Sequence, residues 1–556
     1  MIKTLILMYM ISTTITLETI NASIHYIRQT KKYIVKKGIY DENAIAFGNY
    51  TSSYEEKGWD FLTISSYSGN DNKYADHTKS YAMGFLEGVL TYKRIYDHWR
   101  NMKHFKYYDN NATMPDLIYE FFKQNLDYVK YKSTSLKDTN QYWYEVYNLY
   151  RQMVGLNEGY NSMVTDDKKI DLINFQTVIS VGDLDELRYW KNQASRPNYS
   201  NMTISEIKDY INLRSHCSSL IKVSPDYSDL WFGHNTWTAY NKMIRIYKEY
   251  KYIPNEGHEV KSNVVTMSSY PGAINSQDDF YITDKDLYIA ETTNHIYDNN
   301  LWDLLTPNSL MCWMRTMLAN RLSDNSKYWA DIFQIENSGT YNNQFQILDL
   351  KKINTTSKDI QDEAFYILEQ MPGFCGIEDV TQTLRYGYWP SYNTPYIKQI
   401  RKMSGYDNIL IEKPELYDSI DYSGCTRAKI FRKYQGGVND INSYKKLMRF
   451  DDYINEPLAK NDPGNVIAER ADLYNKTEST TPRCYGCTDL KFASINDVLG
   501  KKNKKIYLIN GPPAETNNPF DWNNTVCVNY QEIRWRNYGQ VNKYNFDMIE
   551  YNTSLM

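Results

Sequence analysis

The chain contains 556 residues, of which 42% are hydrophobic and 23% are charged. This is the composition of a globular protein and excludes a disordered or collagen-like chain; at roughly 150 residues per domain, the length corresponds to about three to four domain-equivalents. Lys and Arg number 63 against 67 Asp and Glu, a net charge of −4. Because there is no strong basic excess, we expect no nucleic-acid partner.

The first 22 residues have the pattern of a secretory signal peptide. Lys3 precedes an apolar run from Leu5 to Ile11, and small or polar residues follow. The run has the length of a signal core and is too short to span a bilayer; the alternative is a buried N-terminal strand. No other stretch reaches 18 uninterrupted apolar residues. We therefore expect no transmembrane anchor, and a protein that is secreted or reaches a lysosomal or vesicular compartment.

A secretory leader gives meaning to the Asn-x-Ser/Thr sequons, which accept glycans on surface loops. Chance alone explains several sequons in an Asn-rich chain, and the one at Asn21 can leave with the leader. We expect a subset of the others to be glycosylated: Asn49, Asn111, Asn198, Asn201, Asn354, Asn475, Asn523 and Asn552.

The amino-terminal part is predicted to be helical after a polar segment that contains a strand. Tyr81, Phe85, Val89 and Tyr92 recur at the spacing of one helix face. Residues 190–212 are polar and read as a linker, of the kind in which chains are cut. The predicted elements are a strand over 24–27 and helices over 80–102, 116–131 and 141–156, the last with Asp138 in its cap region.

Strands dominate after the linker. Cys217–Val223 and Leu230–His234 flank a turn and predict a hairpin. A helix is then predicted from Asn235 or Thr236 to about Tyr250, since Tyr240, Met243, Ile244 and Tyr247 form an apolar stripe. Further strands are predicted at 263–267, 280–283, 287–293, 345–350 and 365–371, with a helix at 309–321. Antiparallel strands interleaved with helices indicate an α+β layered architecture.

Familiar hydrolase motifs are missing from the sequence. It contains no G-x-S-x-G elbow, no HExxH and no phosphate-binding P-loop. Seven cysteines leave at least one unpaired. Cys484 and Cys487 form a CxxC, which lacks the second half of a zinc site, so a local disulfide is the preferred interpretation and two free thiols the alternative. We predict no metal and no cofactor.

Cys217 is the candidate nucleophile. It opens a strand directly after the linker, and His234 ends the partner strand, so the hairpin brings a thiol and an imidazole to one edge. A Cys–His pair can activate the thiol. Cutting the chain before Cys217 would instead supply its own α-amino group as the base. The alternative is that Cys217 is a small core residue.

Segments distributed over most of the chain carry a family resemblance. They are Gly84–Thr91, Gly182–Leu187, Ser215–Lys222, Gly233–Trp237, Met267–Tyr281, Glu291–Thr293, Gly339–Gln344, Tyr388–Pro395 and Arg427–Arg432. In order and content they resemble the phospholipase B-like family, which is related to the lamina ancestor protein.

The resemblance implies an N-terminal-nucleophile hydrolase, a four-layer αββα sandwich with an additional helical amino-terminal portion. Such proteins are precursors. By analogy the Cys217 thiol attacks the carbonyl of His216, an ester forms by acyl shift, and water releases a new N-terminus. A chain of 23–216 would stay associated with the chain of 217–556. The residue before the nucleophile, His216, departs from the small residue expected in some relatives.

The resemblance also assigns pocket residues. Catalytic roles fall on Cys217, His234, Asn393 and Arg427, and pocket-lining roles on Trp237, Thr292 and Thr293. An Asn amide can donate to an oxyanion, and a permanently charged Arg can stabilise an oxyanion or a carboxylate product. Each residue has a structural alternative: a core wall for the Trp, a hairpin hydrogen bond for the His, a turn for the Asn and a buried ion pair for the Arg.

Three functions follow as hypotheses. The first is an acyl hydrolase of phospholipids, the second an amidase that uses the same mechanism on N-acyl or peptide amides, and the third a non-enzymatic glycoprotein with vestigial self-cleavage. The expected partner is thus a lipid or an acyl amide. The acyl chain, the head group and the oligomeric state are not encoded in any pattern that we can identify.

Overall fold

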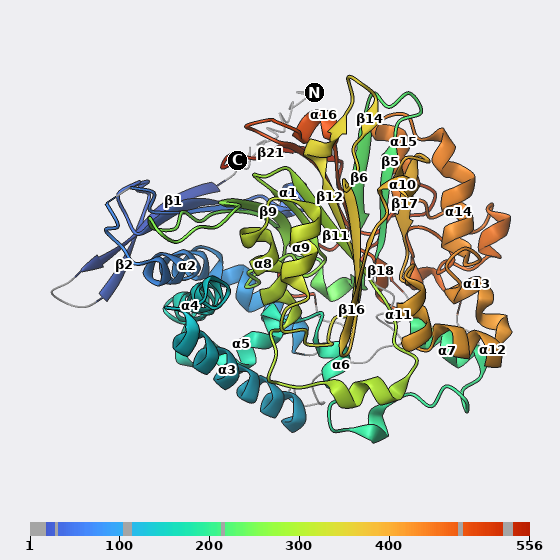
Figure 1. Ribbon diagram of the computed structural model, residues 1–556, viewed down its shortest axis with the longest axis horizontal. Coiled ribbons are helices and arrows are strands. Elements are labelled where there is room, and N and C mark those ends of the chain that lie inside the picture. Colours follow the sequence, from blue (N-terminus) through green and yellow to red (C-terminus); the bar gives the residue numbers. More distant parts are fainter. Residues whose placement is uncertain are drawn as a thin grey trace, which may run out of the picture.

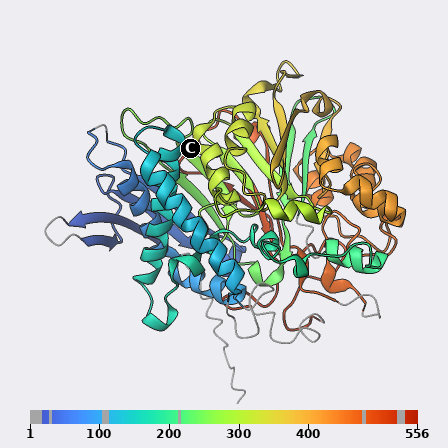
Figure 2. The same ribbon diagram turned by 60° about the horizontal axis from the view of Figure 1, so that its bottom comes forward.

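The computed structural model describes residues 18–27, 32–69, 71–103, 114–212, 217–475, 482–525 and 537–556. Most of the predicted leader, Asn111 and His216 lie outside these ranges. Two large β-sheets face each other, and helices cover the outer face of each (Figure 1, Figure 2). The contact between the sheets is apolar; for example, the rings of Phe232 and Tyr288 lie 4.4 Å apart.

The larger sheet has eleven strands in the described residues. All neighbours are antiparallel except β4 and β8, which pair in parallel from Asp60↔Ile246 to Ser65↔Lys251. This pair joins the strands that precede Cys217 to those that follow it. In spatial order the strands are β16 (Phe374–Asp379), β15 (Phe365–Met371), β12 (Asn343–Asp349), β11 (Leu287–Thr293), β10 (Phe280–Thr283), β9 (Val264–Ser269), β8 (Ile246–Lys251), β4 (Asp60–Ser66), β3 (Ala46–Ser52), β1 (Glu18–Ile27) and β2 (Lys32–Lys37).

The smaller sheet is antiparallel throughout and carries the predicted hairpin as β5 and β6. Its strands are β17 (Tyr388–Ser391), β5 (Ser218–Val223), β6 (Leu230–Asn235), β19 (Asp489–Ser494), β20 (Lys505–Asn510) and β21 (Ile549–Asn552). Two short pairs complete the strands: β13 (Ile353–Asn354) with β14 (Asp359–Ile360), and β7 (Trp237–Ala239) with β18 (Tyr485–Cys487).

Helices pack on the outer faces. The rings of Trp329 and Phe333 in α9 pack on Phe345 of the larger sheet, and Tyr444 of α15 donates to the carbonyl of Leu220 in the smaller one. The α-helices are α1 (Tyr54–Lys57), α2 (Asp76–Met102), α3 (Asp116–Leu136), α4 (Gln141–Asn161), α5 (Leu172–Ile179), α6 (Leu184–Leu187), α7 (Ile204–Asn212), α8 (Cys312–Leu322), α9 (Ser326–Phe333), α10 (Thr381–Leu384), α11 (Lys398–Met403), α12 (Tyr406–Glu412), α13 (Tyr417–Ile420), α14 (Thr426–Tyr434), α15 (Ile441–Met448) and α16 (Ile495–Val498).

The amino-side helices are tied to the sheet through α2. A Cβ atom on Gly84 would lie 2.0 Å from the carbonyl oxygen of Gln152, so glycine allows α2 and α4 to touch backbone to backbone. On the sheet side, the buried Glu87 carboxylate pairs with the Lys248 ammonium of β8 at 2.7 Å. If either partner of this buried ion pair is removed, the other is left in the interior as an uncompensated charge, which destabilises the fold.

The predicted helix from 235 to about 250 is wrong. The segment forms β7, a short 3-10 turn and β8. Tyr240, Met243, Ile244 and Tyr247 are all buried, but so are the residues between them, because β8 is an interior strand of the larger sheet. A strand that is buried on both faces does not alternate between polar and apolar residues. Its sequence pattern therefore cannot be distinguished from that of a helix.

Most other predicted elements are present, with shifted ends. The linker of 190–212 contains α7, and the helix predicted from 141 is capped by Asn140, whose side chain accepts from the Trp143 N–H, and not by Asp138. β1 begins at Glu18, so the predicted leader boundary at residue 22 falls inside a strand.

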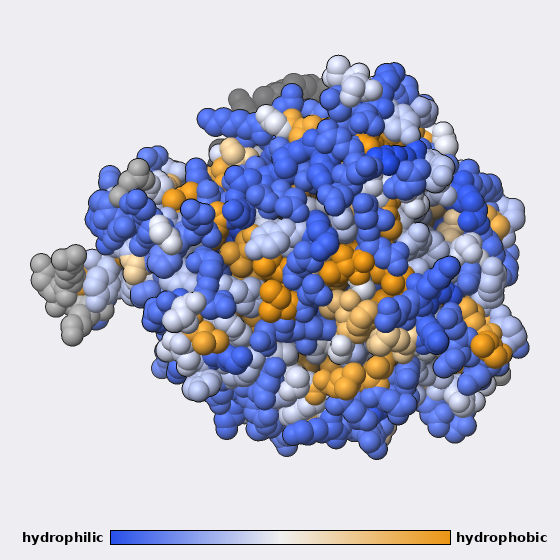
Figure 3. Space-filling model, in the orientation of Figure 1, coloured by the Kyte–Doolittle hydropathy of each residue, from blue (hydrophilic) through white to orange (hydrophobic). Residues whose placement is uncertain are grey.

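A helix that crosses a membrane must be both long and apolar. Within the described part of the chain, none of the helices combines the length and the hydropathy needed to cross a bilayer. One face is mainly hydrophilic, with apolar side chains gathered near its middle (Figure 3).

Candidate active site around Cys217

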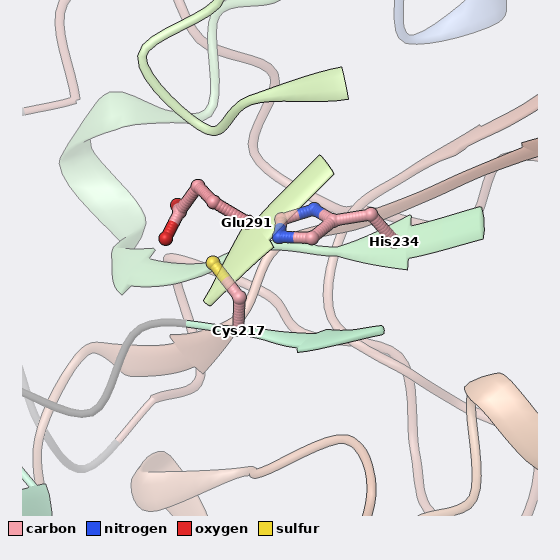
Figure 4. A group of neighbouring side chains, drawn as sticks. All are labelled: Cys217, His234 and Glu291. Carbon is pink, nitrogen blue, oxygen red and sulfur yellow. The ribbon is translucent and has the colours of Figure 1, made fainter. Parts of the chain in front are cut away.

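Cys217 lies immediately before β5 and is 1% exposed. The register Ser219↔His234 brings the next strand alongside it, as the hairpin predicted. The Cys217 sulfur, a His234 ring nitrogen and a Glu291 carboxylate oxygen all lie within 4.8 Å of one another (Figure 4). Glu291 comes from β11 of the other sheet, so the site lies where the two sheets face each other.

Burial sets the protonation of this cluster. It raises the pKa of the Cys217 thiol well above its usual value, and the nearby Glu291 adds to the rise. Burial and then Lys491 hold the pKa of His234 well below its usual value. The pKa of Glu291 is raised by burial and then by Asp279. At neutral pH the cluster thus contains a thiol and a neutral imidazole, and burial favours the neutral form of the Glu291 carboxyl.

His234 has an unused capacity for proton transfer. Among the described residues, neither of its buried ring nitrogens meets strict hydrogen-bond geometry, although a contact with the Glu291 backbone offsets part of the fall in the pKa of the imidazole. A neutral imidazole without a competing donor can accept the thiol proton when the sulfur attacks a carbonyl.

The backbone side of Cys217 is held by Arg427 of α14. The guanidinium donates to the Cys217 carbonyl at 2.8 Å, to the Ser218 hydroxyl at 3.2 Å and to the Asn393 side-chain oxygen at 2.7 Å. It also lies over the Trp237 ring, with its carbon 4.3 Å from the ring centre. Arg427 therefore connects three of the predicted site residues.

Asn393 links Arg427 to the two threonines. Its side-chain amide donates to the Thr293 carbonyl at 2.7 Å, and its backbone N–H donates to the Thr292 hydroxyl at 3.3 Å. That hydroxyl shares a 2.6 Å hydrogen bond with Ser391. Asn393 has a φ of 66°, a left-handed conformation that Asn tolerates better than most residues.

A buried charge cluster next to the thiol was missed by the sequence reasoning. Lys491 pairs with Asp278 at 2.7 Å and with Asp489 at 3.0 Å, and Arg245 contacts both carboxylates, the second at 2.7 Å. Burial opposes ionisation of Asp278, but Arg245 and Lys491 outweigh it and hold the pKa of Asp278 below its usual value. Thr236 joins the cluster by donating to Asp278 at 2.8 Å.

The cavity at the thiol is small. It has a volume of about 40 Å³ and is lined by Cys217, Trp237, Lys242 and Tyr341 together with the amino-side residue Gly182. At about 10–15 Å³ per water centre, it holds about three waters. A separate cavity of about 130 Å³ also contacts Trp237 and is lined partly by α7.

The predicted Cys484–Cys487 disulfide is wrong. Cys484 is disulfide-bonded, whereas Cys487 is a free thiol whose sulfur lies 3.4 Å from the Asp489 carbonyl oxygen. The residues after Cys484 form the extended strand β18. At about 3.3 Å per residue, Cα atoms three positions apart lie about 10 Å from each other, beyond the ~7 Å limit for a disulfide.

The sequon asparagines within the described ranges lie mostly at the surface. Asn49 is half-buried within β3. The exposed ones are Asn198, Asn201, Asn354, Asn475, Asn523 and Asn552. Their exposure is what a glycan requires, and glycosylation remains a prediction.

The sequence of the chain matches known proteins over most of its length. The profile of the family described as Phospholipase B matches residues 46–551. Phospholipase-B 81 of Drysdalia coronoides is 36% identical over 95% of this chain and 92% of its own, and Phospholipase B-like protein D of Dictyostelium discoideum is 34% identical over 94% and 89%. Bovine Phospholipase B-like 1 is 33% identical over 94% and 91%. The chain belongs to the phospholipase B family.

Proposed function

We propose that this chain is a self-cleaving cysteine N-terminal-nucleophile hydrolase that removes acyl chains from phospholipids in a secreted or lysosome-like setting. One observation carries the proposal: a buried thiol at the start of β5 lies within 4.8 Å of a buried imidazole whose ring nitrogens do not meet strict hydrogen-bond geometry in the described residues. The phospholipase names of the relatives support the substrate class.

The layer order supports the proposed fold. Two large sheets with helices on their outer faces are compatible with the αββα arrangement that we propose from the resemblance (Figure 1). The helical amino-terminal portion of α2 to α5 extends this sandwich on one side.

Self-cleavage would begin at the Cys217 sulfur. His234 takes the thiol proton while the sulfur bonds to the carbonyl carbon of residue 216. The C–N bond to Cys217 then breaks, its nitrogen is protonated to an amine, and a thioester remains. Water hydrolyses the thioester to a new carboxyl end and returns the thiol. Chains of about 23–216 and 217–556 result and stay associated.

The backbone at Cys217 favours this reaction. Its φ is 102°, a region that a non-glycine residue occupies at a cost of order 1–3 kcal/mol. Cleavage before Cys217 removes the torsion and releases this strain. Arg427 meanwhile fixes the Cys217 carbonyl, so the strain cannot relax by rotation on that side.

Turnover would use the same sulfur. The free α-amine of Cys217 takes the thiol proton, the sulfur attacks the acyl carbonyl, and the leaving group departs with a proton. Water then releases the fatty acid from the thioester. Asn393 and Arg427 are the proposed stabilisers of the developing oxyanion. An acyl chain needs more than the present cavity of about 40 Å³, so Gly182 and its neighbours must shift before substrate enters.

The test uses Cys217→Ala beside Cys312→Ala. Both cysteines are buried, so the second variant controls for the loss of a core thiol. We expect Cys217→Ala to remain one chain and to lose turnover of phosphatidylcholine. We expect wild type and Cys312→Ala to give a fragment whose N-terminal residue is Cys217. Normal turnover by Cys217→Ala would contradict the proposal.

The polar lining of the small cavity favours one second candidate, an amidase. Thr236, Lys242 and Gln277 line the space that an acyl chain would need. Incubating the matured protein with phosphatidylcholine and with an N-acyl amide separates the two activities. Exclusive hydrolysis of the amide would replace the phospholipid assignment, and a cut protein inert to both would support the non-enzymatic glycoprotein.

A further inference from the structure

Three buried side chains, of which Cys217 also lines the small cavity, have the donor atoms of a transition-metal site. Cys217 offers a sulfur, His234 a ring nitrogen and Glu291 a carboxylate oxygen, all within 4.8 Å of one another. Cys217 lies immediately before β5 and His234 lies in β6, both of the smaller sheet, whereas Glu291 comes from β11 of the larger sheet. We propose that this cluster binds one Zn²⁺ ion, although the sequence alone predicts no metal.

The donor set and spacing suit zinc. Zinc takes sulfur at about 2.3 Å and nitrogen or oxygen at about 2.0–2.2 Å in tetrahedral geometry, and sites with three protein ligands leave the fourth position to water. Donors around such an ion lie roughly 3.3–3.6 Å apart by that geometry. Separations of at most 4.8 Å therefore need only side-chain adjustments to close on an ion. The adjoining cavity has room for the water.

The imidazole of His234 is the independent sign of a ligand. It is fully buried, and neither ring nitrogen meets strict hydrogen-bond geometry with a partner among the described residues, although the Glu291 backbone lies close to the ring. A buried ring nitrogen in this state has a lone pair to offer to an ion. Figure 4 shows the ring approaching the sulfur from the side opposite to the Glu291 carboxylate.

The Glu291 carboxylate is already oriented by neighbours. The Tyr341 hydroxyl donates to one oxygen at 2.7 Å, and the Asn343 amide, in its hydrogen-bonding orientation, donates to the other at 3.0 Å. Outer contacts of this kind fix the ligands of protein metal sites.

The charge balance also permits an ion. Next to the site, Arg245 and Lys491 offset Asp278 and Asp489. A Zn²⁺ ion with one thiolate and one carboxylate adds no net charge, so binding does not leave an uncompensated charge in the interior. The proton of the thiol and that of the carboxyl leave to solvent as the ion enters.

Binding would occupy the sulfur that the proposed function needs. Zinc would then hold back both chain cleavage and turnover, a consequence that rests on the proposed function. The binding itself does not, because all three ligands are in place in the described chain.

The test is spectroscopic and uses Co²⁺ as the probe on the purified full-length protein without substrate. Thiolate bound to Co²⁺ gives a charge-transfer absorption band, and Zn²⁺ competes it away. We expect one equivalent of Co²⁺ to give the band in wild type and in Cys312→Ala, whose lost thiol is buried elsewhere. We expect no band in Cys217→Ala.

Two further variants separate ligation from a general fold defect. Tyr341→Phe should weaken Co²⁺ and Zn²⁺ binding by about 10- to 100-fold, the usual effect of losing an outer contact, and Glu291→Gln should weaken it more. No band in wild type, a band in Cys217→Ala, or unchanged affinity in Glu291→Gln would overturn the site. A protein that is never cut when kept free of metal, yet shows the band once Co²⁺ is added, refutes the proposed function alone.

Discussion

The two sides of Cys217 are built in opposite ways. On the carbonyl side, Arg427, Asn393 and Thr292 form a continuous series of hydrogen bonds. On the sulfur side, neither ring nitrogen of His234 meets strict hydrogen-bond geometry in the described residues, and burial raises the pKa of Glu291. The first side has the features of a scaffold, and the second keeps groups that can exchange protons or accept a ligand. We therefore expect substitutions on the carbonyl side to lower mainly the stability of the protein, and substitutions on the sulfur side to lower mainly its reactivity.

Arg427→Met should give the largest loss of stability. It leaves the Cys217 carbonyl and the Asn393 oxygen without their buried donor, at about 1–3 kcal/mol for each unsatisfied group. We expect the free energy of unfolding in urea to fall by about 3 kcal/mol, with slower chain cleavage. Arg432→Met is the matched control, because Arg432 lies exposed on the same helix. Equal losses in the two variants would contradict a scaffold role for Arg427.

Raising the pH should next destabilise the protein through two buried acids, Asp279 and Glu186. Glu186 lies in α6 and accepts from the N–H of Tyr341, a residue that lines the small cavity. Burial raises the pKa of Glu186 to about 8 and that of Asp279 to about 7. An acid whose pKa is raised in the folded state contributes its full stability below its unfolded pKa and loses it as the pH rises toward the folded value. The melting temperature should therefore fall between pH 5 and pH 8.

Glu186→Gln sharpens this second prediction. The amide keeps the neutral form at every pH, so the fall in melting temperature between pH 5 and pH 8 should become smaller. Thermal scans of both proteins at several pH values provide the measurement. A fall of the same size in the variant would show that Glu186 does not titrate as its burial requires.

His234→Leu should have the smallest effect on stability. Neither ring nitrogen of the imidazole meets strict hydrogen-bond geometry in the described residues, so an apolar side chain of similar size should change the free energy of unfolding by less than about 1 kcal/mol. Chain cleavage should nevertheless be slowed strongly, as seen by gel electrophoresis over time. A large loss of stability, or cleavage at the wild-type rate, would remove the contrast between the two sides.

The sequence predicted the hairpin of the site but not its third member. Cys217 and His234 meet because the two strands are joined by a tight turn, a local relation that spacing reveals. Glu291 comes from the other sheet, and Lys491 follows Glu291 by 200 residues. No local pattern encodes such contacts, although a charged residue inside an otherwise apolar strand, as in Leu490-Lys491-Phe492, was a usable signal.

The missed strand β8 has the same physical origin. An apolar stripe that includes Tyr247 predicted an amphipathic helix over residues 235–250, yet the charged Lys248 and Glu249 of this segment are buried as well. Lys248 is neutralised by Glu87 of α2, far away in the sequence. The sequence pattern of β8 was therefore misleading, because a charge that pairs with a distant residue can be buried in a central strand. By contrast, the strands at 280–283 and 365–371 were predicted with their observed ends.

The parallel pair of β4 and β8 has a consequence for how the protein can be recovered after denaturation. It places strands from both sides of the proposed cut in a single hydrogen-bonded sheet. An unbroken chain regains this sheet at any dilution, because its halves are tethered. Two severed pieces must first find each other, so their refolding yield would depend on concentration. The two chains would thus fold together before the cut, and the cut protein would refold less efficiently after denaturation than the uncut precursor.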